Sequence, residues 1–459
     1  MADISYESAS YGRSLPLWQL VDDVYQGDTA WLEYRQDGSV GVTAKTRRYL
    51  PQEAGEKDSD YTLRALRSHF SDKFSQAVRD FVGVVFNNGV QLVDVPGEIR
   101  QHWENLDGNG MGGDRLCALL GLQVLRRGHS FVLVDFSALD ESIVSLADVR
   151  GSERHPIWQA IAPQAVINWR FERRGNRQVL VMAVVRSVVN VPADEFGEVE
   201  KTYYTLLRPG RYDCYEPVKG TAGKVDYVRV PERSGVMGRR VRGRVMPFEH
   251  IPLVCLYGGD RIGFFESNPT LLSLAQLNIA HYQVKSDHRQ KMHYCSFPTP
   301  VRIGGDGSDL VIGPRTVVDV PPGGGFAWSE PNSQSLALSR QEVLDLESEM
   351  DLLGADYLVK PSDRQAAMTS VIQAAKVESE LYLFASDLAQ GITECLRYHA
   401  AYLGLPTGGR AELDTKFFRD LGGDPQLLLA LLQMRERDDI SRDELRAFAY
   451  RKKFLVEDD

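Results

Sequence analysis

The sequence lacks several features that would assign it to a common class of protein. Its 459 residues contain only five cysteines, and no two of them form a CxxC pair. A disulfide framework or a structural zinc site is therefore not expected, and a reducing compartment is favoured. The longest apolar runs, such as VLVMAVV at 179–185, have the length of a strand rather than of a membrane span. The first residues, MADISYESAS, show neither the basic nor the apolar region of a signal peptide.

Common catalytic motifs are also missing. The one Gly-Lys pair, Gly223-Lys224, has Val218 and Val225 where a phosphate-binding loop requires Gly and Ser or Thr. Neither HExxH nor GxSxG occurs. Three acidic residues follow an expected strand, where catalytic carboxylates often lie, but turn and cap chemistry explains them at least as well. They are Asp135, Asp140 and Glu141. We therefore expect no enzymatic activity.

The balance of charge is acidic, because 53 Lys and Arg residues against 63 Asp and Glu residues give a net charge of −10. Contact of such a chain with DNA would use local basic patches or shape. The nine histidines are scattered. His281 and His288 lie on one expected helix with Lys285 between them, and this cation argues against a metal site. We expect neither a metal nor another cofactor.

Amphipathic helices are expected over residues 1 to about 127. Apolar residues recur at spacings of three and four within residues 16–27 and 61–86. The second stretch predicts one apolar stripe, made of Leu63, Leu66, Phe70, Phe74, Ala77, Val78 and Phe81. From 129 to about 266, β-branched and aromatic segments separated by turn residues predict strands. The Arg-rich residues 233–245 predict a loop that contacts phosphate, or a basic hairpin tip that lies in solvent or faces an acidic neighbour.

Long helices dominate the remainder of the chain. Residues 268–295 predict a helix with an apolar first half and a basic second half. Pro- and Gly-rich residues 297–334 predict a compact β insertion. A second helix is expected to start at Ser339, where Ser339 and Glu342 form a capping box. After a break, residues 371–404 predict a helix of roughly 50 Å. Its apolar face is Val371, Ala374, Leu381, Ala385, Leu388, Ile392, Cys395 and Tyr402. The fold class is α+β.

The order of these elements resembles that of the portal proteins of tailed bacteriophages, which connect the head to the tail. Several stretches agree with one sequence group of portals. They are RRYLP, GHSFVLVDF, QAVINWRF, IPLV, LESEMDLLGADYL and the longer segments at 61–86, 268–305 and 378–404. Their order and spacing, rather than any single motif, carry the resemblance, which spans nearly the whole chain.

The resemblance implies a portal-like ring subunit with a mixed α/β wing, a helical stem, a small β clip and a helical C-terminal crown. The implied bounds are a wing at 1–266, a stem helix at 267–293, a clip at 294–338, a second stem helix at 339–356, a tunnel loop at 357–370, a long wing helix at 371–404 and a crown at 405–459. Because the chain is short for a portal, the clip and the crown are expected to be small.

The resemblance also implies a dodecameric ring at one capsid vertex, which is the channel for genome packaging and ejection. The implied partners are further copies of the chain, non-specifically bound double-stranded DNA, terminase, a head–tail adaptor, the major capsid protein and a scaffolding protein, with no membrane. The ring is expected in the virion after assembly in the host cytoplasm. The residues expected to face DNA are Lys360 and Arg364 of the tunnel loop and Lys285, Arg289 and Lys291 of the first stem helix.

Three alternatives stay open. Residues 357–370 are a plain helix–helix connector in the first. In the second, the chain is another oligomeric structural protein of a virion. In the third, it is an α+β enzyme without a recognisable motif, which a stable monomer with a deep polar pocket would favour.

Overall fold

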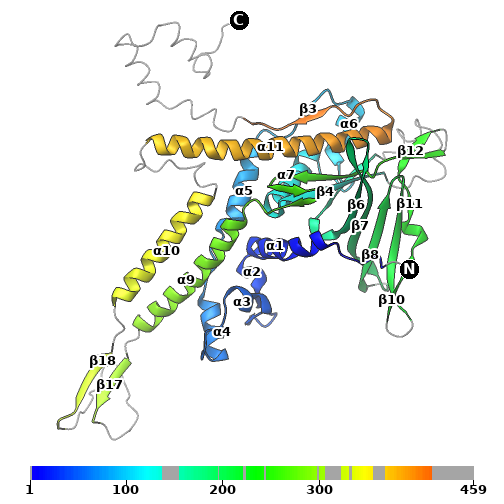
Figure 1. Cartoon of the computed structure of the whole chain (residues 1–459). Helices are drawn as coiled ribbons and strands as arrows, with labels where there is room; N and C mark the ends of the chain where they lie inside the picture. Colours follow the sequence, from blue (N-terminus) through cyan, green and yellow to red (C-terminus); the bar gives the residue numbers. More distant parts are fainter. Residues whose placement is uncertain are drawn as a thin grey trace, which may run out of the picture. The chain divides into compact units, whose positions relative to one another are not determined.

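The structure is a computed structural model, and it describes residues 3–136, 155–194, 196–220, 224–241, 244–296, 299–304, 322–329, 333–354 and 367–415. The chain forms two compact units (Figure 1). Unit 1 contains Met1–Trp18, Val78–Thr270 and Lys360–Asp459, and unit 2 contains Gln19–Ala77 and Leu271–Val359. The chain passes from one unit to the other within α1 (Ala9–Gln26) and within α5 (Lys73–Val85). The mixture of helices and antiparallel strands confirms the α+β class.

Unit 1 is built on a six-stranded antiparallel sheet. Its order is β10-β9-β8-β7-β6, with β11 also paired to β9. The strands are β6 (Val166–Arg174), β7 (Arg177–Pro192), β8 (Glu198–Arg208), β9 (Arg211–Lys219), β10 (Val225–Arg229) and β11 (Gly235–Val236). Alternate residues of β7 and β8 enter two different cores, because successive side chains of a strand point to opposite faces. Val184 and Leu206 pack with Tyr11 and Trp18 of α1.

A second, three-stranded antiparallel sheet covers the other face of the large sheet. Its order is β14-β4-β5, with β14 (Leu253–Tyr257), β4 (His129–Asp135) and β5 (Ile157–Ile161). Phe131 and Leu253 of this sheet share a buried cluster with Ala183 and Leu207. The β-rich segment expected after residue 129 is therefore confirmed.

Two long helices accompany these sheets. The first, α7 (Gly113–Arg127), ends at Gly128, whose φ of 86° is the left-handed cap that the sequence predicts. The second, α11 (Ala367–Leu403), packs on β14. A Cβ atom at Gly258 would lie 2.4 Å from Val124 and 2.7 Å from Phe384, so glycine permits this close approach. The predicted apolar face of the helix is buried at every described position from Leu381 to Tyr402.

The remaining elements of unit 1 are short. They are β3 (Gln91–Val93), which pairs with β19 (Arg410–Glu412), α6 (Gly97–His102), η1 (Trp103–Asn105), η2 (Pro163–Ala165), η4 (Pro231–Arg233), and the hairpins β12 (Gly238–Val241)–β13 (Arg244–Pro247) and β15 (Arg261–Gly263)–β16 (Glu266–Ser267). The Arg-rich stretch at 233–245, expected as a loop, thus forms β11 and most of a hairpin.

Unit 2 contains two long helices joined through a β ribbon. The helices are α9 (Leu272–Ser296) and α10 (Ser333–Leu353), and the ribbon is β17 (Thr299–Ile303) paired with β18 (Gly325–Ser329). The expected β insertion is therefore present in the described residues. Smaller elements complete the unit: α2 (Asp28–Trp31), β1 (Leu32–Tyr34), β2 (Val40–Val42), α3 (Ala44–Tyr49) and α4 (Asp58–Arg67).

An aromatic cluster forms the core of unit 2. The ring centroid of Trp31 lies 4.7 Å from those of Tyr49 and Phe70 and 5.5 Å from that of Tyr282 on α9. Trp31, Tyr49, Phe70 and Tyr282 are all buried. Large aromatic side chains supply much of the stability of a small core, so Tyr282 is the main anchor of α9 in this unit.

Three sequence expectations need correction. The stripe over residues 61–86 is not continuous, because the backbone of Ser68 is extended and ends α4 before α5 begins. As a result Leu63 and Leu66 are 56% and 39% exposed, whereas the later members of the stripe are buried. The helix expected from Ser339 begins at Ser333, and Ser339 is buried within it. The long helix begins at Ala367, inside the expected tunnel loop.

Candidate nucleic-acid interface

The basic half of α9 is the part of the described chain that the sequence predicts to meet DNA. The helix packs antiparallel against α10 in unit 2, and the β17–β18 ribbon joins their far ends (Figure 1). Leu274, Ala275 and Asn278 of its first half are fully or almost fully buried. This burial explains why the apolar residues of α9 gather before residue 283, and it leaves the second half nearer to solvent.

Asn278 fixes the position of α9 against the start of α5. Its side-chain Oδ1 accepts a hydrogen bond from the backbone N–H of Phe74 at 3.0 Å, and its Nδ2 donates to the carbonyl of Ser71 at 2.8 Å. The side chain is fully buried, and both ends of the amide have a partner. Asn278 lies among the buried apolar residues of α9, where an amide without hydrogen-bond partners would lower the stability of the fold.

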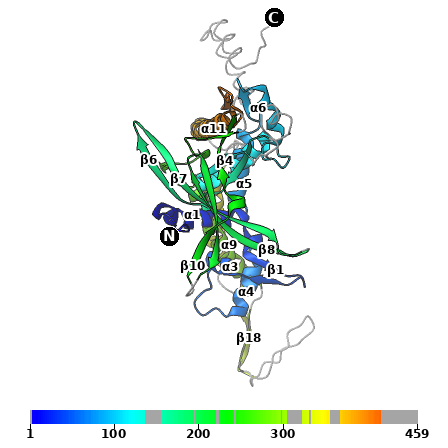
Figure 2. The same cartoon turned by 90° about the vertical axis from the view of Figure 1, so that its right-hand side faces the viewer.

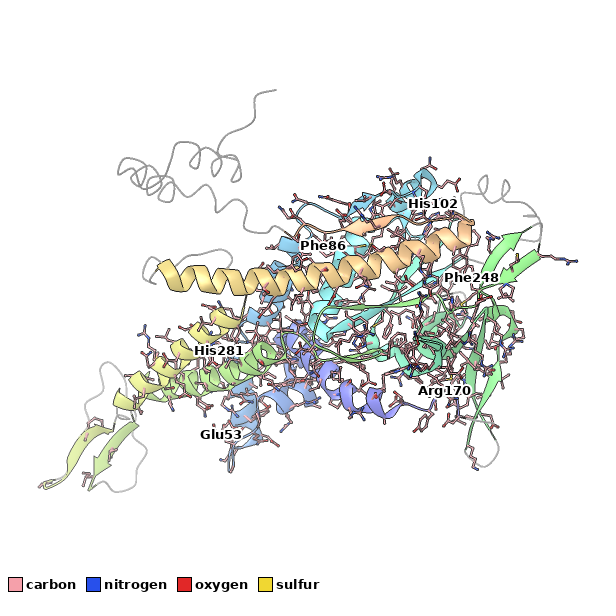
Figure 3. All side chains as sticks on the ribbon, turned by 45° about the horizontal axis from the view of Figure 1, so that its top comes forward. Glu53, Phe86, His102, Arg170, Phe248 and His281 are labelled. Carbon is pink, nitrogen blue, oxygen red and sulfur yellow. The ribbon has the colours of Figure 1, made fainter. Side chains whose placement is uncertain are left out.

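Lys285 is the first of the three DNA contacts predicted on α9. Its ammonium group is held by neighbours within its own unit. Its ammonium group lies 2.8 Å from the Ser71 hydroxyl and 3.6 Å from a carboxylate oxygen of Glu347 on α10. The same carboxylate oxygen lies 3.1 Å from Nε2 of His281 (Figure 3). Burial lowers the pKa of His281, and the Glu347 carboxylate opposes that shift. Lys285 therefore ties α9 to α10.

Arg289 and Lys291 are exposed. The guanidinium of Arg289 donates to the carbonyl of Arg67 at 2.8 Å and keeps its outer edge in water. Lys291 borders a shallow cleft between α9 and α10. The cleft is lined by Val284, Asp287, Lys291, Ser335, Leu338, Ser339 and Glu342. Because two carboxylates share this cleft with one ammonium group, it is a poor site for phosphate, and Lys291 would reach an anion only from outside it.

The two helices carry opposite charge. The basic residues of α9 are Lys285, Arg289 and Lys291, and its one acidic residue is Asp287. Helix α10 has one basic residue, Arg340, and five acidic ones. The five are Glu342, Asp345, Glu347, Glu349 and Asp351. Of these two helices, α9 therefore offers a positive surface, in its exposed part. The other two predicted contacts, Lys360 and Arg364, lie outside the described residues, as do Asp140, Glu141 and the crown from residue 416 onward.

Two polar clusters were missed by sequence reasoning. In unit 1, Nε2 of the buried His399 lies 3.0 Å from Nδ1 of His102, and the rings of His102 and His155 stack at 4.7 Å. In unit 2, Arg64 makes an ion pair with Glu56, and both side chains are more than nine-tenths buried. Periodicity gives no signal for either cluster, because the partners come from different elements.

Asp135 is the final residue of β4. Burial raises the pKa of its carboxyl group, and the backbone N–H of Phe136 donates to it at 2.8 Å. That local hydrogen bond is the turn chemistry that the sequence offered as the alternative to catalysis. Within the described ranges, no group of three or more His, Cys, Asp or Glu side chains has the arrangement of a metal site. No helix in the described part of the chain has the length and apolar content needed to span a bilayer.

One protein-family model matches the part of the chain that contains its long helices. Residues 270–403, which contain α9, the β17–β18 ribbon, α10 and α11, match a family described as a domain of unknown function, DUF4055. No curated protein matches the chain.

Solved structures that resemble the chain come from gene transfer agent (GTA) particles. One is described as the neck of the empty GTA particle with C6 symmetry, at 13% identity and a TM-score of 0.38, covering 87% of this chain and 95% of that one. Another is the virion of the native particle, at 13% identity and a TM-score of 0.37, covering 88% and 98%. A third is the neck of the native particle with C12 symmetry, at 13% identity and a TM-score of 0.35, covering 82% and 88%.

Because the identities and TM-scores are this low, we base the functional proposal on the chain's own elements.

Proposed function

We propose that this chain is the portal protein of a tailed-phage-like particle. It forms a dodecameric ring at one capsid vertex, and double-stranded DNA passes through the ring during packaging and ejection. The chain itself does not hydrolyse ATP, a task that belongs to a separate terminase docked on the ring. A head–tail adaptor, the major capsid protein and a scaffolding protein are its other partners. The ring assembles in the host cytoplasm and remains in the virion.

One observation carries the proposal: the antiparallel α9–α10 pair is joined by a β ribbon and followed by the 37-residue α11. This is the order of stem, clip, stem and long wing helix that the sequence resemblance implies. A head-to-tail ring requires every subunit to present two different, complementary surfaces. The exposed sides of α9 and α10 differ in charge, so the stem of one subunit presents two unlike surfaces.

The parts of the subunit follow from this order. We assign the stem to α9 and α10, the clip to the residues between them, and the tunnel loop to the residues between Leu353 and Ala367. The wing comprises the residues before α9 together with α11, and the crown comprises the residues after α11. Compared with the sequence expectation, the second stem helix starts six residues earlier and the long helix four residues earlier.

DNA contacts in the channel are few and non-specific in this proposal, because DNA must slide. Phosphate contacts made by exposed Lys and Arg side chains bind without reading sequence. Arg289 and Lys291 of the stem have the exposure that such contacts need. Lys360 and Arg364 of the tunnel loop are the second pair. The contribution of Lys285 is smaller, since Glu347 and Ser71 already engage its ammonium group.

Negative-stain electron microscopy and native mass spectrometry of the purified chain test the proposal. We expect closed rings with a central channel and a mass of twelve subunits. A strictly monomeric species, both in purified protein and in protein recovered from particles, would contradict it. An oligomer without a channel would instead favour another structural component of the virion. A monomer with ATPase or nuclease turnover that one acidic substitution abolishes would favour an enzyme.

A further inference from the structure

The large sheet of unit 1 carries opposite charge at the two ends of its longest strand. Strand β7 has 16 residues and would extend over roughly 50 Å if fully straight. At its start it meets β6 in a tight turn after Arg174, and at its end it meets β8 in a turn around Asp194. The two turns therefore lie at opposite ends of the same sheet (Figure 2).

The end shared by β6 and β7 is basic. Exposed arginines flank the turn at positions 170, 173, 174 and 177, and Arg174 faces Arg177 across it. Figure 3 labels Arg170, which is the middle residue of β6. Among the described residues, none of the four guanidinium groups forms an ion pair. Glu172 is the one acidic residue between positions 170 and 177, so this stretch has a positive excess.

The end shared by β7 and β8 is acidic and stands apart from the rest of the sheet. Strand β6 pairs with β7 only up to Val185, and β9 pairs with β8 only from Tyr204 onward. The residues beyond these points form a two-stranded ribbon. Val188, Val189 and Val199 of this ribbon are exposed, so it offers apolar area to a partner.

One face of this ribbon is acidic. Glu198 lies opposite Pro192, and Glu200 lies opposite Asn190, so both carboxylates share a face. Both are exposed, and neither forms an ion pair with a described residue. Lys201 points to the other face, where its ammonium group pairs with Glu216 at 2.7 Å. The ribbon's acidic face is therefore not neutralised by its own lysine.

Each end also has an exposed apolar centre. The tip of the ribbon carries Phe196, which is 92% exposed. Asp194 accepts hydrogen bonds from the backbone N–H groups of Phe196 and Gly197, so the turn that presents this ring is held in place. At the basic end, Phe264 is 43% exposed and lies 4.8 Å from Phe171 of β6. Arg173 shares the face of Phe171, because it lies two residues further along the strand.

We propose that the acidic ribbon of one copy of this chain docks against the arginine-bearing β6–β7 end of a neighbouring copy. Glu198 and Glu200 meet the guanidinium group of Arg173, which shares the face of Phe171, and that of Arg174, which reaches around the turn from the opposite face. The Phe196 ring packs against Phe264 and an arginine. An apolar centre with a charged rim is the usual composition of a specific interface, and arginine binds both carboxylates and aromatic faces. The contact is heterologous, as a ring requires, so the inference rests on the proposed ring function.

Two double variants test this contact. Arg173→Glu with Arg174→Glu makes both ends acidic, and Glu198→Lys with Glu200→Lys makes both ends basic. Each variant alone is expected to self-associate about tenfold more weakly than the wild type at low ionic strength, because like charges then face each other. An equimolar mixture should assemble again, with the two variants alternating. Native mass spectrometry resolves the composition, and an alternating ring contains equal numbers of both chains.

A matched control keeps the charge: Arg173→Lys with Arg174→Lys should assemble like the wild type. All four substituted positions are exposed, and circular dichroism verifies that each variant is folded. The inference is overturned if either charge-reversed variant assembles normally, or if the two weakened variants fail to combine. A basic-end variant that assembles normally but loses retention of a DNA duplex would assign the arginines to nucleic acid instead.

The same experiments distinguish a failure of this contact from a failure of the proposed ring. If the wild type forms no closed ring, the proposed function fails. The charge-reversed variants still report on the contact in that case, since sedimentation of their mixture shows either a complex of the two chains or two separate species. Only the first of these results supports the inference.

Discussion

Trp158 donates its indole N–H to Nδ1 of His399 at 3.2 Å, in the interior of unit 1. An indole nitrogen only donates, so Nδ1 of His399 accepts, and the proton of the neutral ring sits on Nε2. That nitrogen lies 3.0 Å from Nδ1 of His102 and donates to it. The tryptophan thus fixes the tautomers of two histidines that come from α11 and α6. A proton added to His399 would break the indole hydrogen bond.

Stability should therefore fall in mild acid. Burial lowers the pKa of His102 to about 4, with a further contribution from the neighbouring His155. Burial also places the pKa of His399 well below its ordinary value. Both histidines take up a proton more readily in the unfolded chain than in the folded one. Their contribution is complete above about pH 6.5 and is lost as the pH falls towards about 4.

The measurement is urea unfolding of the wild type and of His102→Gln at several pH values between 7.5 and 4.5. We expect a smaller loss of stability for the variant across this range, since glutamine does not titrate. His250→Gln is the control, because His250 is exposed and meets water in both states. Parallel pH profiles for the wild type and His102→Gln would show that the cluster does not control acid stability.

Asn278 is the second position where a specific loss of stability is expected. Asn278→Leu preserves the size of the side chain but leaves the N–H of Phe74 and the carbonyl of Ser71 buried without their partners. Two such groups cost about 2–4 kcal/mol of unfolding free energy. Gln276→Leu is the matched control on the exposed face of the same helix and should change stability by less than about 0.5 kcal/mol. Equal effects of the two substitutions would contradict this account.

Helices and strands could be predicted from the sequence where one periodicity runs through a whole element. The face of α11 from Leu381 to Tyr402 and the strands β4, β6 and β7 follow such patterns, and they were predicted. The stripe over 61–86 misled because Ser68 breaks the helix, after which the phase of α4 no longer continues into α5. The spacing of apolar residues cannot reveal an extended residue between two helices when the same spacing continues on both sides of that residue.

Partners of polar residues were harder to predict. The basic half of α9 was expected to present one positive strip, yet Lys285 turns to Glu347, a residue 62 positions later. His102, His155 and His399 looked scattered because their contact depends on how α6, the residues just before β5, and α11 pack. Pairing across long separations is a property of tertiary packing, and no spacing rule in a single sequence encodes it.

The buried pair Arg64–Glu56 allows a third prediction. The Nε and Nη2 atoms of Arg64 donate to the two carboxylate oxygens of Glu56 at 2.8 and 2.9 Å, and Nη2 also donates to the Pro51 carbonyl at 2.8 Å. Arg64→Met should cost about 3–5 kcal/mol, because it leaves a buried carboxylate without its counter-charge. The exposed pair Arg47–Asp58 is the comparison, with charged atoms 3.8 Å apart, and Arg47→Met should cost about 0–1 kcal/mol. If the midpoints of thermal unfolding of Arg64→Met and Arg47→Met fall by the same amount, the distinction between the buried and the exposed pair is refuted.

The stem residues of α9 should separate into a structural and a DNA-facing group. Lys285→Met removes the bond to Ser71 and the pairing with Glu347, and we expect a loss of about 1 kcal/mol in stability. Arg289→Glu with Lys291→Glu should leave stability within about 0.5 kcal/mol, because both side chains are exposed. If α9 lines the channel, the double variant lowers the DNA content of particles while rings still form. Rings that fail to form would identify these residues as contacts between subunits.

The final prediction concerns Lys360 and Arg364, which lie between the end of α10 at Leu353 and the start of α11 at Ala367. If this segment reaches the channel, it centres or grips DNA through two positive charges rather than driving it. Lys360→Glu with Arg364→Glu should leave ring and procapsid formation intact, because neither residue belongs to an apolar stripe of the sequence. The expected defect is a lower genome content per particle, since two carboxylates would repel the phosphates that pass them. Lys360→Arg with Arg364→Lys keeps both charges and should package normally. Genome filling and retention at the wild-type level in the charge-reversed variant would refute a DNA role for this segment, whereas failed ring formation would make it a contact between subunits.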